Sequence, residues 1–423
     1  MLLKAPWILP VNVPPIKNGA IRVRGDIIEE VGGAQEIIRR PEEKVVELPE
    51  TILLPGLINA HAHLEFFQLS PSPSSPPIKG GDNLLQNIPS PLAGEGKGEG
   101  GKSFTQWVRT MITLQGKSSQ NELTARAKKS AQALLESGVT TAALHLSSDL
   151  PPDCLHAIAF RTVTFVEVIG PTEERARAGF AKAMNWKIES LIGQEGEIYL
   201  TPHSFYSVHP HATEKILETA EGLVSIHLLE SEEEDQFFRN RSGPLAELVT
   251  ERDGSLLFPR TSPIQWLAAH HRLTKNLLIV HGNTLTPEEI RLLQKGESSV
   301  IHCPGSHRYF GHRRFPLEEL KEAGVTVALG TDSLASNEKL SMLWEMKLLR
   351  EKTKMPDDEI LKMATLNGAK ALLREKESGS LEPGKKADII GLPLRSTDPF
   401  KALFETEKVS FMMINGKTLC TTH

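Results

Sequence analysis

The chain has 423 residues, of which 39% are apolar, and this is enough for one large domain and a second, smaller one. Its net charge of -5 provides no basic surface, so we expect no nucleic-acid partner. The three cysteines lie far apart, which favours a reducing cytoplasm over a disulfide scaffold, and no stretch approaches the roughly 20 apolar residues of a membrane helix.

The two ends of the chain show a similar pattern of short strands and turns. The start, MLLKAPWILPVNVPPIKNG, lacks the features of a signal peptide, and residues 19–32 alternate apolar and polar positions around Arg-Gly-Asp, as in a hairpin. Residues 387–394 also resemble a strand, and residues 409–419 resemble a hairpin with an Asn-Gly turn. Neither end has enough strands to bury a core alone. We therefore expect one small, discontinuous β-sandwich domain from residues 1–54 and 380–423.

The middle of the chain, residues 55–379, alternates strands with helices. After a first strand that ends in two histidines, the expected strands are residues 139–146, 162–170, 197–204, 223–231, 276–283, 298–306 and 325–333. The expected helices are residues 121–138, 173–190, 213–222, 244–252, 262–271, 286–296, 316–324 and 339–352. Near-continuous apolar strands between helices are typical of a parallel sheet. Eight or nine such units over about 320 residues predict an α/β fold, a (β/α)8 TIM-like barrel with insertions.

Residues 70–101 are rich in proline, glycine and serine, which predicts a flexible, low-complexity loop. Loops of this length are either lids or disordered insertions. We favour an insertion without a role; because the loop directly follows the first histidine pair, a lid over the site is the alternative.

Four histidines and one aspartate end apolar runs: His61 and His63, then His227, His281 and Asp332. Residues i and i+2 of a strand face the same way, so His61 and His63 point together. The carboxyl ends of the barrel strands form one face, where active sites lie. At one such position, a hydrogen-bonded core histidine is the ordinary interpretation. This interpretation weakens when later strands also end in possible metal ligands. Imidazole and carboxylate suit zinc and iron(II), so a metal site is predicted.

Glu230 lies three residues after His227, in the expected loop at the mouth of the barrel. A carboxylate at this place can perform the acid–base chemistry of hydrolysis. The acidic run that follows, Glu232–Asp235, is interpreted as a solvated helix start, because acidic residues favour the first helical turn.

The segments PGLINAHAH, HLLES, IVHGN and LGTDSLASN resemble the motifs of the amidohydrolase superfamily, in its mononuclear deaminase and chlorohydrolase branch. GSLEPGKKADII is similar to the segment that returns these chains to their small β domain. The resemblance spans nearly the whole chain. It implies one divalent metal ion, zinc first and iron(II) as the alternative, held by His61, His63, His227 and Asp332. It also implies that Glu230 shuttles protons, with Asp332 among the catalytic residues.

The resemblance gives His281 the role of orienting and polarising the attacking water. From the residues alone, His281 is also a possible metal ligand. Binuclear relatives use a carboxylated lysine or a glutamate from the fourth strand, which we take to be residues 162–170. This segment has no lysine but contains Glu167. Because a buried acid is more often paired structurally, we expect one metal ion.

Within the branch, HAHLEFF, FTQWV and HLLESEEE look most like aminodeoxyfutalosine deaminases, with methylthioadenosine/S-adenosylhomocysteine deaminases close by. Glu65 shares the face of the histidine pair and is a candidate substrate contact, with a structural acid as the alternative. Trp107 is a candidate platform for a purine, with a core tryptophan as the alternative. His203 resembles a substrate-contacting histidine that such enzymes carry at the end of the fifth strand.

The segment CPGSHRYFG departs from the pattern of these relatives. His307 replaces the usual asparagine, and Gly305 replaces a commonly larger residue, which leaves the exact substrate open. Cys303 in this segment is not interpreted as a nucleophile, because an activated water makes one unnecessary and a buried thiol is usually inert.

Three functions remain from the sequence. The first is hydrolytic deamination of an adenine nucleoside, with a small molecule as the substrate and a homodimer as the expected assembly. The second keeps the site and changes the bond that is cleaved, as in a chlorohydrolase or a cyclic amidase. The third is a barrel subunit that has lost catalysis, which the complete set of candidate residues argues against.

Overall fold

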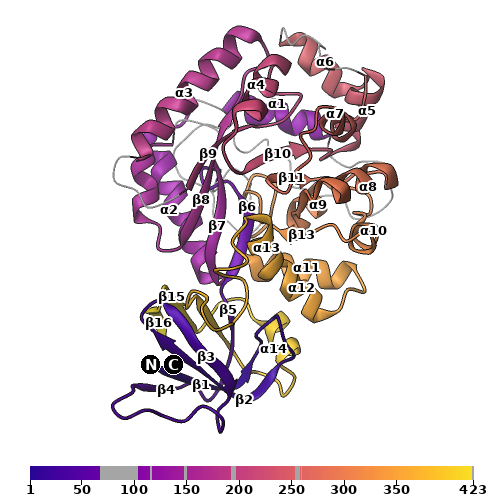
Figure 1. The fold of residues 1–423 in the computed structure, drawn as a ribbon. Coiled ribbons are helices and arrows are strands. Elements are labelled where there is room, and N and C mark those ends of the chain that lie inside the picture. Colours follow the sequence, from indigo (N-terminus) through magenta and orange to yellow (C-terminus); the bar gives the residue numbers. More distant parts are fainter. Residues whose placement is uncertain are drawn as a thin grey trace, which may run out of the picture.

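The computed structural model describes residues 1–66, 103–114, 117–146, 150–191, 197–252, 258 and 260–421. The predicted loop of residues 70–101 lies outside these residues. Figure 1 shows a β-rich part that carries both chain ends and a larger part built from strands and helices.

The β-rich part is one eight-stranded sheet with the order β16-β15-β14-β5-β1-β2-β3, in which β4 pairs with β1. Its strands are β1 (Leu2–Ile8), β2 (Ile16–Arg24), β3 (Ile27–Gly33), β4 (Val45–Glu47), β5 (Thr51–Pro55), β14 (Ile389–Pro393), β15 (Phe411–Ile414) and β16 (Lys417–Thr421). Both expected hairpins are present, because β2 pairs antiparallel with β3 and β15 with β16. Strands from the two ends of the chain therefore share one sheet, while the domain limits at residues 54 and 380 stay a prediction.

The larger part contains two four-stranded parallel sheets, β6-β7-β8-β9 and β10-β11-β12-β13. Their strands are β6 (Leu57–Ala62), β7 (Val139–Leu146), β8 (Arg161–Val168), β9 (Glu197–Pro202), β10 (Val224–Leu228), β11 (Leu277–His281), β12 (Ser299–His302) and β13 (Val327–Leu329). Isolated bridges join the two sheets on both sides, between Ser204 and His227 and between Ala62 and Asp332. The predicted (β/α)8 barrel is confirmed.

Helices surround the strands of the barrel (Figure 1). They are α1 (Phe104–Leu114), α2 (Gln120–Glu136), the short 3-10 helix η2 (Pro152–Ala157), α3 (Glu173–Leu191), α4 (Pro210–Thr219), α5 (Glu232–Asn240), α6 (Pro244–Glu251), α7 (Pro263–Ala269), α8 (Pro287–Gly296), α9 (Pro304–Phe310), α10 (Leu317–Glu322), α11 (Met342–Lys352), α12 (Asp357–Met363) and α13 (Leu366–Ala371). A further helix, α14 (Pro399–Glu405), lies beside the β-rich part and contacts β14. Among the described residues, no helix has both the length and the apolarity to cross a membrane.

The apolar run before the histidine pair forms two strands and not one. β5 belongs to the terminal sheet, where it pairs with β14, and β6 starts the barrel. Gly56 separates them at a point where a Cβ atom would lie 2.0 Å from the Oγ1 atom of Thr140. Only glycine allows the backbone to approach the neighbouring strand so closely at this crossing.

Because β6 is the first barrel strand, β8 is the third and β9 is the fourth. The sequence-based count was therefore wrong by one in two places. Glu167 lies on the third strand and not the fourth, and His203 follows the fourth strand and not the fifth.

Candidate metal centre

The four predicted metal ligands and His281 meet at the carboxyl ends of four barrel strands. His61 lies in β6 with His63 just beyond it, His227 lies in β10, His281 ends β11, and Asp332 follows β13. All five are buried. Parallel strands bring their carboxyl ends to one face, and this is why residues up to 271 positions apart in the chain, His61 and Asp332, become neighbours.

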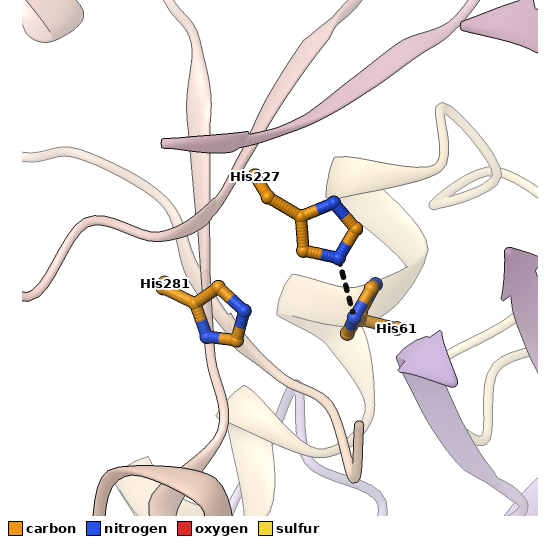
Figure 2. Close-up of side chains that lie close together, drawn as sticks. All are labelled: His61, His227 and His281. Carbon is orange, nitrogen blue, oxygen red and sulfur yellow. Dashed lines mark hydrogen bonds between the residues drawn. The ribbon is translucent and has the colours of Figure 1, made fainter. Parts of the chain in front are cut away.

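The donor atoms lie at spacings that suit one metal ion. The Nε2 atom of His227 is 3.2 Å from Nε2 of His61 (Figure 2). It is also 3.4 Å from Nε2 of His63. The Oδ1 atom of Asp332 is 3.6 Å from Nε2 of His61. Tetrahedral zinc with bonds of about 2.05 Å to nitrogen places its ligand atoms roughly 3.3 Å apart. The arrangement of three imidazoles and one carboxylate therefore fits a single divalent metal ion.

His281 faces the same space from the neighbouring strand (Figure 2). Its ring can place a nitrogen within 4.8 Å of donor atoms of His61 and His227, and within the same distance of Glu230 and Asp332. The Nε2 atom of His281 is 3.6 Å from Oε2 of Glu230. This ring is thus close to the donor set and to the predicted proton carrier at once.

The electrostatics of the site favour neutral imidazoles. Burial, and then the charges of His227 and His63, hold the pKa of His61 well below its usual value. Burial also lowers the pKa of His63, and it lowers the pKa of His227 to about 4. A neutral imidazole offers a lone pair, which a cation needs from its ligand.

The pKa of Glu230 is shifted in the opposite direction, upward. Burial raises its pKa well above the usual value, and the charges of Asp332 and Glu234 act in the same direction. Its backbone is fixed on both sides, because its N–H donates to Oε2 of Glu234 at 2.8 Å and its carbonyl accepts from Nδ2 of Asn283 at 2.9 Å. A carboxyl group in this environment can hold a proton and release it to a neighbour.

The interpretation of Glu232–Asp235 as a solvated helix start was only partly right. These residues do start α5, but Glu234 is buried and supports the backbone of Glu230. Glu233 accepts hydrogen bonds from the N–H groups of Phe104 and Thr105 at 3.0 and 2.9 Å and so fixes the start of α1. The acidic run predicted the start of the helix, but the partners of its acids come from distant segments.

Asp332 and His281 both have a left-handed backbone, with φ of 55° and 72°. This conformation costs residues other than glycine about 1–3 kcal/mol, and surrounding contacts have to maintain it. The hydroxyl of Ser336 donates to Oδ2 of Asp332 at 2.6 Å, which leaves Oδ1 toward His61. The strained geometry turns the side chains of both strand ends toward the donor set.

The three candidate substrate contacts lie around this centre. His203 is half-buried and stacks on His227 with ring centroids 4.7 Å apart. The half-buried indole of Trp107 donates to the carbonyl of Ala335, three residues after Asp332, at 3.0 Å. Glu65 is buried, and its charge contributes to the raised pKa of Glu167. The structure brings all three to the mouth of the barrel, and their contacts with a substrate stay predictions.

Glu167 reaches the donor set from β8. Its Oε1 atom is 3.5 Å from Nδ1 of His227, and His63, Glu167 and His227 can place ligand atoms within 4.8 Å of one another. However, Nδ1 of His227 also lies 3.0 Å from the carbonyl of His203, which acts as its acceptor. Burial, then the charge of Glu65, raises the pKa of Glu167 well above its usual value, which favours a protonated acid. The count of one ion remains our prediction.

Sequence reasoning missed residues that support the site. His145 ends the apolar run of β7, the same signal that selected the other histidines, and its Nδ1 atom is 3.0 Å from Nδ1 of His61. His302 ends β12 with the same signal, but its ring stacks on Phe315 with centroids 3.9 Å apart. A histidine at the end of an apolar run therefore indicates this face of the barrel and not a role in metal binding.

Residues 303–311, which depart from the sequence pattern expected for the relatives, contain α9 and its N-cap. His307 lies over His302, with ring centroids 5.4 Å apart. A Cβ atom on Gly305 would lie 2.2 Å from the side-chain oxygen of Asn337, so a larger residue does not fit here unless Asn337 moves. Burial raises the pKa of the Cys303 thiol well above its usual value, which agrees with an inert cysteine.

Comparison with known proteins identifies the family. The model of the amidohydrolase family matches residues 52–419, which includes every strand of the barrel. The chain belongs to the amidohydrolase family. Its members are hydrolases, and the donor set described above agrees with a divalent metal ion at this position.

Individual relatives are similar over almost the full length. A 5-methylthioadenosine/S-adenosylhomocysteine deaminase of Moorella thermoacetica is 29% identical over 418 residues, covering 93% of this chain and 86% of the relative. The crystal structure of Helicobacter pylori aminofutalosine deaminase with methylthio-coformycin has a TM-score of 0.81 and 22% identity, and covers 99% of each chain. An atrazine chlorohydrolase of Arthrobacter aurescens TC1, in complex with zinc, has a TM-score of 0.74 and 19% identity, covering 100% of this chain and 95% of that one.

Proposed function

We propose that this protein is a metal-dependent aminohydrolase that removes the 6-amino group of an adenine nucleoside and releases ammonia. The observation that carries the proposal is the set of His61, His63, His227 and Asp332 beside the Glu230–His281 pair, whose Oε2 and Nε2 atoms are 3.6 Å apart. The similarity to a deaminase of Moorella thermoacetica over 93% of the chain supports the choice of this reaction.

The four donors would hold one divalent ion, with zinc as our first choice and iron(II) as the alternative, because imidazole and carboxylate suit both. When bound, the ion would supply an activated water and Lewis acidity. The neutral state that burial imposes on the imidazoles fits this role. So does the Ser336 hydroxyl, which occupies Oδ2 of Asp332 and leaves Oδ1 free.

Glu230 would carry protons through the reaction. As the oxygen of water bonds to carbon 6 of the adenine ring, Glu230 accepts a proton from that water and passes it to the adjacent ring nitrogen. The hydroxyl group now on carbon 6 gives up its remaining proton, which reaches the amino group through Glu230; the carbon–nitrogen bond breaks, the carbonyl of hypoxanthine forms, and ammonia leaves. The raised pKa of Glu230 suits a group that accepts and returns a proton. His281 would hydrogen-bond the attacking oxygen and stabilise its developing charge.

The substrate would lie at the mouth of the barrel. Trp107 is the proposed platform for the flat purine, because its indole ring is tied to the loop after Asp332. His203 and Glu65 are the proposed contacts to the sugar, since both lie next to the donor set and are polar. Aminodeoxyfutalosine is our first choice of nucleoside. Gly305 and His307, where we expect a departure from the sequence pattern of the relatives, are our candidates for adapting the pocket.

A nucleoside panel with ammonia detection tests the proposal. Metal-replete enzyme is assayed with aminodeoxyfutalosine, adenosine, methylthioadenosine and S-adenosylhomocysteine, and we expect ammonia from at least the first. A chlorotriazine and a cyclic amide are included as rival substrates. If a rival is hydrolysed and no adenine nucleoside releases ammonia, deamination is wrong and the chlorohydrolase or amidase alternative replaces it. If nothing is hydrolysed and no metal is bound, the non-catalytic alternative stands.

The remaining expectations belong with this proposal. We propose a cytoplasmic homodimer, and light scattering of the purified chain and fractionation of its cells would test the two parts separately. We also propose that residues 1–54 and 380–423 together form one small β domain and that residues 55–379 form the barrel domain. Limited proteolysis that releases an intact barrel fragment would support these limits.

A further inference from the structure

His145 lies directly beneath the donor set, and no step of the proposed reaction uses it. It is fully buried on β7. Its Nδ1 atom is 3.0 Å from Nδ1 of His61, and its Nε2 atom is 2.7 Å from Oγ of Ser225 on β10. A chain of three hydrogen-bonding side chains therefore crosses the barrel interior from the strand of His61 to the strand of His227.

The protons along this chain are linked. A hydrogen bond between two ring nitrogens needs one N–H group and one bare nitrogen. The Nε2 atom of His61 faces the donor set, 3.2 Å from Nε2 of His227, so it has to be bare to bind a cation. The neutral His61 ring then carries its proton on Nδ1 and donates it to Nδ1 of His145. The His145 ring in turn carries its proton on Nε2 and donates it to Ser225.

If both hydrogen bonds ran in the opposite direction, the Nε2 atom of His61 would carry a proton and could not bind a metal ion. If the Ser225 hydroxyl donated to Nε2 of His145, the proton of that ring would sit on Nδ1 and point at His61. His61 would then accept at Nδ1 and keep its own proton on Nε2, toward the donor set. The direction of two hydrogen bonds therefore decides whether His61 can act as a ligand.

The surroundings hold His145 in this place. The ring of Phe165 stacks on it with centroids 4.8 Å apart and an angle of 18° between the planes. Ser225 is also buried, and its backbone N–H donates to Oγ1 of Thr201 at 3.1 Å. Ser225 lies two residues before His227, so its side chain points to the same side of β10 as that donor. A rigid acceptor chain of this kind fixes the orientation of a ligand ring.

We infer that His145 is a positioning residue that keeps His61 in the tautomer whose Nε2 atom is free for the metal ion. The inference rests on the metal site of the proposed function, and it assigns a role to two residues outside that site. Loss of such a supporting partner typically weakens metal affinity by about 10–100-fold.

Metal affinity of the purified apoprotein tests the inference, by competition for zinc with a chromogenic chelator. We expect His145→Leu to weaken zinc binding by roughly 10–100-fold, because it removes the acceptor for the His61 proton. His145→Asn should restore much of the affinity, because its Oδ1 atom can take the place of Nδ1. Ser225→Ala, a smaller change, should weaken binding less than His145→Leu. Phe165→Leu is the matched control, since it disturbs the packing of the same ring but leaves both hydrogen bonds.

The outcomes separate this inference from the proposed function. Wild-type protein that binds no zinc or iron(II) would overturn the proposed function. If the wild type binds zinc and His145→Leu binds it with the same affinity, only the inference about His145 would be overturned. A merely structural role predicts equal losses in His145→Leu, His145→Asn and Phe165→Leu, together with a lower melting temperature of the apoprotein. If His145→Leu does not fold, unchanged zinc affinity in Ser225→Ala would count against the inference.

Discussion

Replacing Glu230 with glutamine should remove proton transfer while leaving the site intact. The contacts that fix this residue use its backbone, to Glu234 at 2.8 Å and to Asn283 at 2.9 Å, so they survive the substitution. Glutamine has nearly the same size and fits the same buried space. The proposed metal donors are other residues, and we expect the metal content of Glu230→Gln to equal that of the wild type.

The loss of activity follows from what the amide cannot do. General acid–base catalysis is worth about 10²–10⁴-fold, or roughly 2.7–5.4 kcal/mol of the activation barrier. The carboxylate of Asp332 can place an oxygen within 4.8 Å of Glu230 and His281. Because Asp332 already accepts a hydrogen bond from Ser336 at 2.6 Å, it cannot fully replace Glu230 as the proton carrier. We therefore expect the loss of activity to lie near the upper end of this range.

The assay is kcat for ammonia release by metal-replete enzyme, with metal content measured on the same sample. Glu289→Gln is the matched control, because it also removes a buried carboxylate, one that caps α8 and pairs with Arg239 at 2.8 Å and that no step of the proposed reaction uses. Near-normal kcat in Glu230→Gln would refute the reasoning, since some other group would then carry the proton. Loss of metal in this variant would show that Glu230 belongs to the ligands.

Three further predictions follow from other contacts. His61→Ala should abolish stoichiometric metal binding by elemental analysis while the circular dichroism spectrum stays native, because the barrel core is apolar and separate from the donors. Gly330→Ala should weaken metal binding and activity at least about 10-fold, because its Cβ atom would lie 2.7 Å from Cβ of His61 and displace that ligand. Glu43→Gln should lower the melting temperature above about pH 4.5. The hydrogen bond from Arg22 lowers the pKa of Glu43 to about 2, so its contribution should fade as the pH falls toward that value.

Each of these has a result that would contradict it. A metal-bound His61→Ala protein would remove His61 from the donor set. Wild-type metal affinity in Gly330→Ala would show that the backbone of β6 can shift without displacing His61. Gly32→Ala is the control, because its Cβ atom would meet only the flexible side chain of Glu36, at 3.2 Å, and the side chain of Ile37 beyond it. A difference in melting temperature between wild type and Glu43→Gln that grows as the pH falls below 4.5 would reverse the sign expected for a lowered carboxyl pKa.

The sequence predicted the barrel because its signals are local. Apolar runs separated by amphipathic helices indicate parallel strands, and Gly25 and the Asn415–Gly416 pair mark turns that the structure contains. The donor residues were found for the same reason, since each ends an apolar run and barrel strands end on one face. The order of the motifs along the chain also indicates the family without any knowledge of the geometry.

Tertiary structure decided what depends on contacts between distant segments. The run before the histidine pair became two strands because Gly56 allows a crossing against Thr140, which no local pattern reveals. Glu234 looked solvated in the sequence but is buried against the backbone of Glu230. His145 and His302 carry the same sequence signal, yet one lies against His61 and the other against Phe315. Periodicity reports which side of a strand a residue occupies, whereas its partner is set by the register and packing of strands far apart in the chain.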